Sequence, residues 1–432
     1  MKLNYKRTFF VGLAFLSICA FWELYDGIVP KMLSSTFGMG ETATGIVMAL
    51  DNILALFLLP LFGAFSDKVD TRIGKRMPFI ITGTALAAVF ILLMPVAEHR
   101  GNLTLFLVAL GVVLISMGLY RSPAVALMPD ITPKPLRSKA NAVINLMGTL
   151  GGAYALLMVK FIYTEDGSSN LPVFLSVVIL MILAVALLVI TIREKKLSVE
   201  RSKDQDMIEE ASKIENNEGP AVKGKNVKMP KNVRKSFIFI MSSIFLWFFA
   251  YNAVKTAFSR YADKVWGLRE GEFADPLMIA IIAALISYIP IGIISSKIGR
   301  KKTIIIGIIM MTSTYFLGFL ASEYTPWINV IFAFTGIGWA AINVNSYPMV
   351  VEMCKGSDTG RYTGYYYTFS MAAQTITPIL SGTLLENVSY RTLFPYAVIF
   401  STASLCTMLF VKHGDSKLVK KADALENFDT PD

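Results

Sequence analysis

The sequence predicts an all-α membrane protein, with twelve transmembrane helices in two pseudo-symmetric six-helix bundles. The first observation is composition, because 54% of the 432 residues are hydrophobic and only 17% are charged, whereas soluble domains average about 25% charged residues. The second is that the apolar residues form runs of about 20, the length with which a helix crosses a ~30 Å hydrocarbon core. The third is a charged link that recurs in both halves of the chain.

Hydropathy places six spans on each side of a polar central segment. The first six cover residues 9–34, 42–66, 77–97, 103–128, 139–163 and 171–192. The second six cover residues 236–260, 275–297, 302–322, 326–353, 362–386 and 390–411. The basic start and first apolar run resemble a signal peptide, but the run continues to about Phe37, so we expect a retained first helix.

These spans divide the chain into four parts. We expect an N-terminal bundle over 1–192, a cytoplasmic linker over 193–235, a C-terminal bundle over 236–411 and a cytoplasmic tail over 412–432. Lys and Arg concentrate on the cytoplasmic side of membrane proteins. With the N-terminus inside, 32 of the 41 Lys and Arg lie in cytoplasmic segments. The sequence thus predicts a multi-pass protein of the plasma or inner membrane with both termini in the cytoplasm.

Two charged links repeat between the halves. "GAFSDKVDTRIGKRMP" (63–78) joins the second and third spans, and "GIISSKIGRKK" (292–302) joins the eighth and ninth. The links after the fourth and tenth spans also correspond, since each begins with an acid and ends with an arginine. Paired signals of this kind indicate two six-helix halves of common design.

The spans, the central linker and the G-x-x-S-D-K…R-x-G-K-R link resemble the major facilitator superfamily over the whole chain. "SDKVDTRIGKRMPFI" and "YRSPAVALMPD" resemble the sucrose-transporter-like branch and the related glycoside–pentoside–hexuronide symporters. The resemblance implies alternating access between the two halves of a monomer. It also implies uptake of a sugar or glycoside, with a disaccharide favoured, together with a proton.

The same resemblance implies that the charged links form a cytoplasmic latch. We expect ion pairs and helix caps across the two halves, or, as the alternative, charges that only enforce topology. The predicted latch residues are Gly63, Asp67, Arg72, Lys75, Arg76, Asp130, Arg137, Glu352 and Arg361.

Ionisable residues inside spans are candidates for function, because each costs at least ~2.5–3.5 kcal/mol to insert. The first span holds Glu23 and Asp26, three apart and therefore on one helix face. The second holds Asp51, and the fourth holds Arg121. One reading is a static buried pair between Arg121 and an acid. The other is proton coupling, with Asp26 or Asp51 as the preferred carrier and Arg121 as counter-charge or solute ligand.

Sodium coupling is less expected than proton coupling. Melibiose-type relatives carry two aspartates four apart before a proline in the second span. The corresponding positions before Pro60 are Ala55 and Leu59 here.

The second half supplies neutral polar and aromatic residues, which suit a sugar because hydroxyl groups need hydrogen bonds and the C–H face needs a flat apolar surface. Interhelical packing is the alternative role for any one of them. Lys255 lies toward the outer end of the seventh span and could snorkel to the interface. The predicted solute-binding residues are Trp22, Tyr25, Arg121, Tyr251, Asn252, Trp339, Asn343, Tyr366 and Gln374.

Other function classes lack support in the sequence. No phosphate loop, G-x-S-x-G or H-E-x-x-H motif occurs, and the chain has only two histidines, so neither an enzyme nor a metal or cofactor is expected. The net charge of +10 follows from the topology, which leaves no reason to expect nucleic-acid binding. The remaining alternatives are transport of another amphiphilic solute, such as a drug or lysolipid, and a non-transporting membrane sensor.

Overall fold

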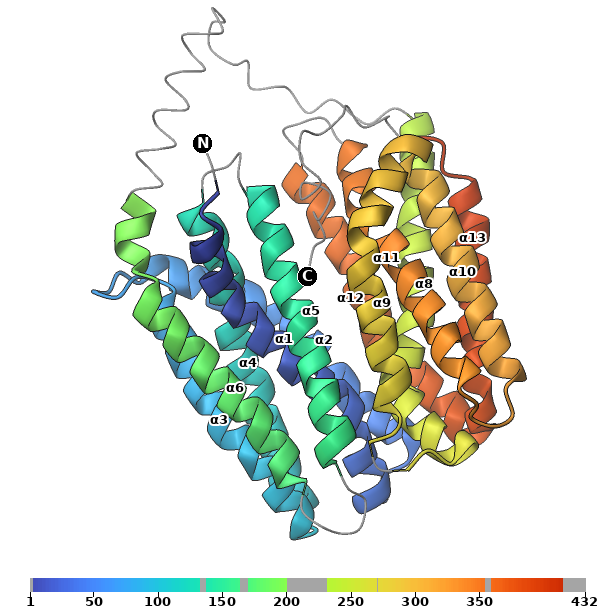
Figure 1. Cartoon of the computed structure of the whole chain (residues 1–432), viewed down its shortest axis with the longest axis horizontal. Helices are drawn as coiled ribbons and strands as arrows, with labels where there is room; N and C mark the ends of the chain where they lie inside the picture. Colours follow the sequence, from blue (N-terminus) through green and yellow to red (C-terminus); the bar gives the residue numbers. More distant parts are fainter. Residues whose placement is uncertain are drawn as a thin grey trace, which may run out of the picture.

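The computed structural model consists of long α-helices (Figure 1). It describes residues 3–132, 137–163, 170–199, 231–269, 271–353 and 359–414. Most of the predicted linker and tail therefore lies outside the described residues. So do the side chains of Arg137 and Arg361.

The helices follow the predicted spans closely. The N-terminal helices are α1 (Tyr5–Lys31) with a π-helical turn η1 (Met32–Thr36), α2 (Glu41–Lys68), α3 (Met77–His99), α4 (Leu103–Ile131), α5 (Arg137–Ile162) and α6 (Leu171–Thr191). The C-terminal helices are α8 (Lys231–Trp266), α9 (Ala274–Ile298), α10 (Arg300–Leu320), α11 (Trp327–Glu352), α12 (Thr359–Asn387) and α13 (Leu393–Leu409), preceded by the short turn η3 (Tyr390–Thr392).

Among the described residues, eleven helical segments are long and apolar enough to cross a membrane. The helix outside that set is α12. It is 29 residues long, but its first half is rich in Tyr and Thr. Local signals explain several helix starts. Asn4 and Asn102 accept a hydrogen bond from the backbone of the first turn of α1 and α4, and prolines occupy the first turn of α3 and α6.

Two six-helix bundles pack against each other along three helix pairs, α2 with α12, α5 with α9, and α1 with α8 (Figure 1). We call the end where α1 begins and α13 ends the terminal end, and the opposite end the far end. Ser236 near the start of α8 contacts His413 just after α13, which places those two segments together at the terminal end. Figure 1 shows the bundles converging toward the far end.

Close backbone approach joins the bundles at the far end. A Cβ at Gly45 of α2 would overlap the carbonyl oxygen of Pro378 in α12. A Cβ at Gly382 of α12 would likewise overlap the carbonyl oxygen of Glu41. Small residues at such contacts let helices pack closely where hydrophobic burial between helices contributes little.

Candidate functional site

A cavity of about 300 Å³ lies between the two bundles. Residues of α1 and α5 line one side, and residues of α8, α9, α10 and α11 line the other. Its wall is mostly apolar with a few polar groups, a composition typical of small-molecule sites. The lining residues include Glu23, Asn145, Tyr251, Lys255, Trp339 and Asn343.

Two aromatic rings form a flat platform in this cavity. Tyr251 of α8 and Trp339 of α11 stack with ring centroids 3.8 Å apart and planes 5° from parallel. Phe248, about one turn before Tyr251, meets Trp339 edge-on at 5.4 Å between centroids. Asn343 follows Trp339 by four residues and therefore lies on the same face of α11. A flat aromatic surface next to an amide is thus available to a bound solute.

A charged cluster joins the bundles beside this platform. The Lys255 Nζ of α8 lies 2.9 Å from Asp26 Oδ2 and 3.6 Å from Glu23 Oε2 of α1. The side chains of Lys255, Asp26 and Glu23 are 27%, 17% and 13% exposed. The alternative that Lys255 snorkels to the interface is therefore wrong, because its ammonium is held by two carboxylates from the other half.

Asp51 and Arg121 lie elsewhere, in a second cavity inside the N-terminal bundle. They line a space of roughly 10 Å³ between α1, α2 and α4, room for about one water molecule. Arg121 interacts electrostatically with Asp51. Asp51 also accepts hydrogen bonds from the backbone and side-chain amides of Asn52, at 2.6 and 2.7 Å. Asp51 thus shares the small cavity with Arg121, whereas Asp26 pairs with Lys255.

Two of the predicted solute-binding residues face the interior of the N-terminal bundle in this arrangement. Trp22 lines the small cavity with Asp51, and Tyr25 is only 1% exposed and packs against Trp22 and Phe21. The prediction that Trp22 and Tyr25 contact a solute in the main cavity is not met here. A helix presents only one face to the cavity, and on α1 that face is the one that carries Glu23.

Three predicted residues of the C-terminal bundle also lie away from the cavity. Asn252 directly follows Tyr251, so it points about 100° away around the helix, and its amide donates to the Phe248 carbonyl. Tyr366 is buried and shares a hydrogen bond with Ser346 at 3.1 Å. Gln374 is not among the residues that line the cavity.

Sequence reasoning missed several lining residues of α5. Asn145, Thr149 and Gly152 recur at i, i+4 and i+7, and this spacing marks one polar helix face that faces the cavity. A Cβ at Gly152 would lie 3.7 Å from both Glu23 Oε2 and Ile281 Cδ1. The glycine therefore leaves room between the two bundles. Other lining residues that the sequence did not single out are Cys19, Tyr288, Tyr315 and Thr335.

Ionic contacts close the far end of the cavity region. Arg260 Nε of α8 lies 2.6 Å from Glu41 Oε2 of α2, and the hydroxyl of Tyr390 donates to Glu41 Oε1 at 2.5 Å. Lys160 of α5 pairs with Asp275 of α9 at 2.6 Å. The sequence did not single out any of these residues, because their partners lie 115 or more positions apart along the chain.

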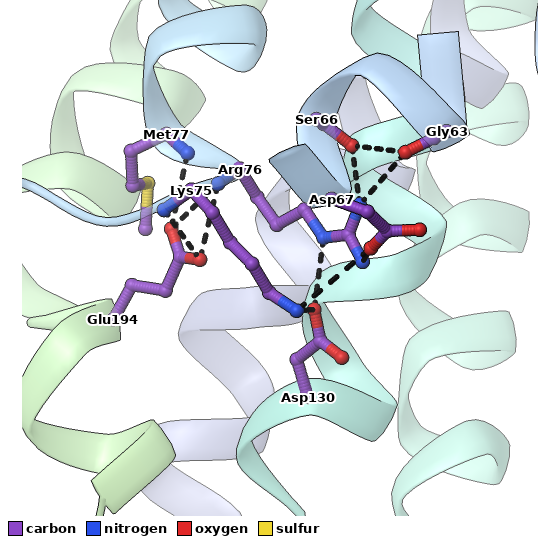
Figure 2. A network of polar contacts seen from close by, with 8 residues as sticks. All are labelled: Gly63, Ser66, Asp67, Lys75, Arg76, Met77, Asp130 and Glu194. Atoms are coloured by element: carbon purple, nitrogen blue, oxygen red, sulfur yellow. Dashed lines mark hydrogen bonds and ion pairs between the residues drawn. The ribbon is translucent and has the colours of Figure 1, made fainter. Parts of the chain in front are cut away.

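A second polar network occupies the terminal end of the N-terminal bundle (Figure 2). The Arg76 guanidinium binds Asp67, Ser66 and the Gly63 carbonyl, and its Nε lies 2.8 Å from Asp130 Oδ2. Lys75 Nζ lies 3.1 Å from the same Asp130 oxygen. The network thus ties α2, the 63–78 link and α4 together within one bundle.

Glu194, which follows α6, completes this network and was not predicted. Its carboxylate accepts hydrogen bonds from the backbone N–H groups of Lys75, Arg76 and Met77 at 3.0–3.1 Å (Figure 2). These are the unpaired N–H groups at the start of α3, where the helix dipole also favours an anion. Gly74 precedes them with φ +122, and a Cβ there would overlap Glu194.

The predicted latch residues therefore form contacts within each half in this arrangement, and the prediction of ion pairs across the halves is not met. Arg72 is exposed and forms no ion pair within the described part of the chain. In the C-terminal bundle, Arg300 pairs with Glu352, the counterpart of Arg76 with Asp130. The reason is geometric, since the ion pairs described between the bundles lie at the far end and beside the cavity, away from these residues.

Two bundles of membrane-spanning helices, joined at one end and enclosing a cavity between them, define a membrane transporter. The profile of the Major Facilitator Superfamily matches residues 11–286 and 257–428, and the chain belongs to this superfamily. It is thus a multi-pass integral membrane protein.

The similar proteins differ in the substrates that their names give. An uncharacterised MFS-type transporter of Methanocaldococcus jannaschii is 25% identical over 90% of both chains. A probable nitrate transporter of Staphylococcus epidermidis is 24% identical over 46% of this chain and 49% of its own length. A solved POT family transporter in complex with a thioalcohol-conjugated peptide has a TM-score of 0.72 at 13% identity, with 94% of this chain and 95% of that chain covered. At that identity the likeness concerns the fold alone.

Proposed function

We propose that this transporter takes up a sugar or glycoside, a disaccharide foremost, together with a proton by alternating access. The observation that carries the proposal is the cavity between the bundles, which holds the stacked Tyr251–Trp339 platform, the Asn343 amide and the Glu23 carboxylate in one place. The aromatic faces suit the C–H surface of a sugar ring. The amide and carboxylate suit its hydroxyl groups.

The charges around the cavity favour an uncharged solute over an anion. Lys255 is the basic residue that lines the cavity in the described part of the chain, and two carboxylates already hold its ammonium. With both carboxylates ionised, the cluster carries a net charge of −1, which repels an anion such as nitrate. A hydroxylated neutral solute can hydrogen-bond to both kinds of group without this penalty.

Proton coupling is supported by the same cluster. The cluster has two carboxylates and one ammonium, so one carboxylate has no cation of its own. Because it lies next to a cavity between two moving bundles, this carboxylate can bind a proton on one side of the membrane and release it on the other. Glu23, Asp26 and Asp51 are the acids of the N-terminal bundle that this proposal offers as carriers. Such a group couples transport to the gradient because its proton affinity differs between the two arrangements.

The orientation and the latch complete the proposal. With the terminal end in the cytoplasm, as the Lys and Arg distribution favours, the contacts at Glu41–Arg260 and Lys160–Asp275 close the outer side. The links at Arg76 and Arg300 would then meet across the bundles only when the cytoplasmic side closes. The proposal includes a monomer as the functional unit and the division of the chain at residues 192 and 235.

The test is uptake by purified protein in proteoliposomes. A panel of labelled mono- and disaccharides is offered with and without an inward proton gradient, and labelled nitrate is offered as the anionic comparison. We expect accumulation of one or more sugars only with the gradient, and no accumulation of nitrate. If an amphiphilic drug or a lysolipid is transported and no sugar is, the substrate is an amphiphilic solute and the sugar proposal is wrong. The absence of any flux would favour the non-transporting sensor.

A further inference from the structure

We infer that Glu23 is the acid that binds the transported proton, and that Lys255 is a positioning residue that holds Asp26 in a bridge between the bundles. The inference rests on the proposed proton coupling. It narrows the carrier to one of three acids, and it differs from the sequence-based preference for Asp26 or Asp51.

The first argument is access. Glu23 and Lys255 line the cavity between the bundles, whereas Asp26 does not. Gly152 leaves the Glu23 carboxylate uncovered on the α5 side, because even an added Cβ there would lie at an ordinary contact distance of 3.7 Å. Water in the cavity can therefore reach Glu23 directly.

The second argument is the division of charge. Lys255 Nζ lies 2.9 Å from Asp26 but 3.6 Å from Glu23, so its short, hydrogen-bonded contact is with Asp26. One ammonium balances one carboxylate, and Glu23 carries the charge in excess. One proton passes from a hydronium ion in the cavity water to Glu23, so that an O–H bond of the hydronium ion breaks, an O–H bond forms on Glu23 and neutral water is left. The cluster becomes neutral, and the release reverses this transfer.

The third argument is that no other cation faces Glu23 in the described structure of the cavity wall. From α8 it is faced by Lys255 and the phenol of Tyr251, and from α5 only by uncharged groups. Phenols ionise only near pH 10, so they do not compete for a proton in the physiological range. The remaining titratable groups around the cluster are Cys19, Tyr25 and Asp26 on α1, Asp51 on α2, Tyr288 on α9 and Tyr315 on α10.

The fourth argument is that Asp51 is not the acid that binds the transported proton. It lines the small cavity of the N-terminal bundle together with Arg121, and the amide groups of Asn52 donate hydrogen bonds to its carboxylate. That cavity has no lining residue from the C-terminal bundle. Movement of one bundle against the other therefore changes the surroundings of Glu23 more than those of Asp51.

The first experiment compares coupling with exchange in proteoliposomes. We expect Glu23→Gln to abolish proton-driven accumulation of the transported sugar while exchange of internal for external sugar continues. Asp70→Asn is the control, because Asp70 also pairs with a lysine but is exposed and does not line the cavity. It is expected to retain accumulation. Accumulation by Glu23→Gln equal to that of the wild type would overturn the inference.

The second experiment needs no sugar, so it separates this inference from the substrate proposal. Spin labels at Thr104 and Ser322, exposed at the far end of the two bundles, report their separation after the three native cysteines are replaced. We expect the distance distribution of the wild type to shift between pH 8 and pH 5. We expect no shift in Glu23→Gln, and a shift restored in Glu23→Asp, which keeps the acid.

Each outcome of the second experiment either supports or overturns the inference about Glu23. A pH-dependent shift that is lost in Glu23→Gln supports the inference even if no sugar is transported, in which case the substrate proposal alone fails. A shift that persists in Glu23→Gln, or that is lost instead in Asp51→Asn, overturns the inference. A wild-type protein without any shift overturns it as well. For Lys255, we expect Lys255→Met to lose proton-driven accumulation and Lys255→Arg to restore it, whereas Lys264→Met, an exposed lysine on the same helix, behaves as wild type.

Discussion

The pair Glu41–Arg260 is expected to hold the far end closed, and Glu41→Gln tests this directly. Of the ion pairs between the bundles in the described structure, this pair is the most buried, with side chains 5% and 6% exposed. The substitution removes the charge but keeps the size, and the new amide oxygen can still accept from Tyr390. The Arg260 charge is then left buried without its counter-ion.

The expected shift from a closed to an open far end can be calculated from the burial of this ion pair. Removing one partner of a buried ion pair costs ~3–5 kcal/mol. The cost applies only to the arrangement in which the pair is buried, because separation of the bundles hydrates Arg260. With a tenfold change for every ~1.4 kcal/mol, the lower figure shifts the ratio of closed to open far ends by about 100-fold.

The assay is the distance between spin labels at Thr104 and Ser322 in detergent or nanodiscs. We expect a single short distance in the wild type and a dominant longer distance in Glu41→Gln. Asp275→Asn is the graded control, because the Lys160–Asp275 pair is about one-third exposed and contributes about 0–1 kcal/mol. Equal, unshifted distances in Glu41→Gln and wild type would refute the reasoning that this pair closes the far end.

Three further substitutions test other parts of the structure. Gly45→Ala places a methyl group against the Pro378 carbonyl, so we expect a longer far-end distance and a transport rate at least ~10-fold lower. Trp339→Ala removes one ring of the stacked platform, worth ~0.5–1.5 kcal/mol, and is expected to raise KM for the transported sugar about 2- to 10-fold with little change in kcat. Arg76→Ala leaves Asp130 without its nearest guanidinium and is expected to lower the Tm of the purified protein by ~5 °C.

Each of these has a matched control. Gly111→Ala on α4 meets open space and is expected to transport normally. Trp327→Ala removes an indole that is 74% exposed and should leave KM unchanged. Asp70→Asn breaks only the exposed contact with Lys195 and should leave Tm unchanged. A control that changes as much as its partner variant would contradict the corresponding interpretation.

The helices could be predicted from the sequence because each apolar run has the length of a membrane crossing. The predicted and observed ends agree within a few residues, with the largest differences at α8. This helix covers Lys231–Trp266, five residues before and six residues beyond the predicted span 236–260. Hydropathy detects the segment embedded in the membrane, whereas the helix continues through the charged residues that precede it.

The cavity could be predicted only in part. Tyr251, Trp339 and Asn343 line it as expected, because they are polar or aromatic residues on central helices. Asn252 and Tyr366 have the same character but face neighbouring helices. The orientation of a helix about its axis depends on its packing partners, and an apolar sequence with weak amphipathicity does not encode it.

The ion pairs were the least predictable feature. Lys255 lies 229 positions from Asp26, and no local pattern links them. Glu194 was assigned to the linker, although its carboxylate caps α3. In contrast, Arg76, Asp67 and Asp130 were correctly grouped, because the link that contains them has a recognisable form. Their partners nevertheless proved to lie within one bundle.

The central claim is that the two bundles move against each other so that the cavity opens to one side at a time. It is tested most directly by measuring two distances in the same preparation, one between labels at Thr104 and Ser322 at the far end and one between labels at Lys68 and Lys302 at the terminal end. We predict that a change in pH or the addition of the transported sugar lengthens one distance as it shortens the other. Two distances that stay fixed, or that lengthen together, would contradict the account.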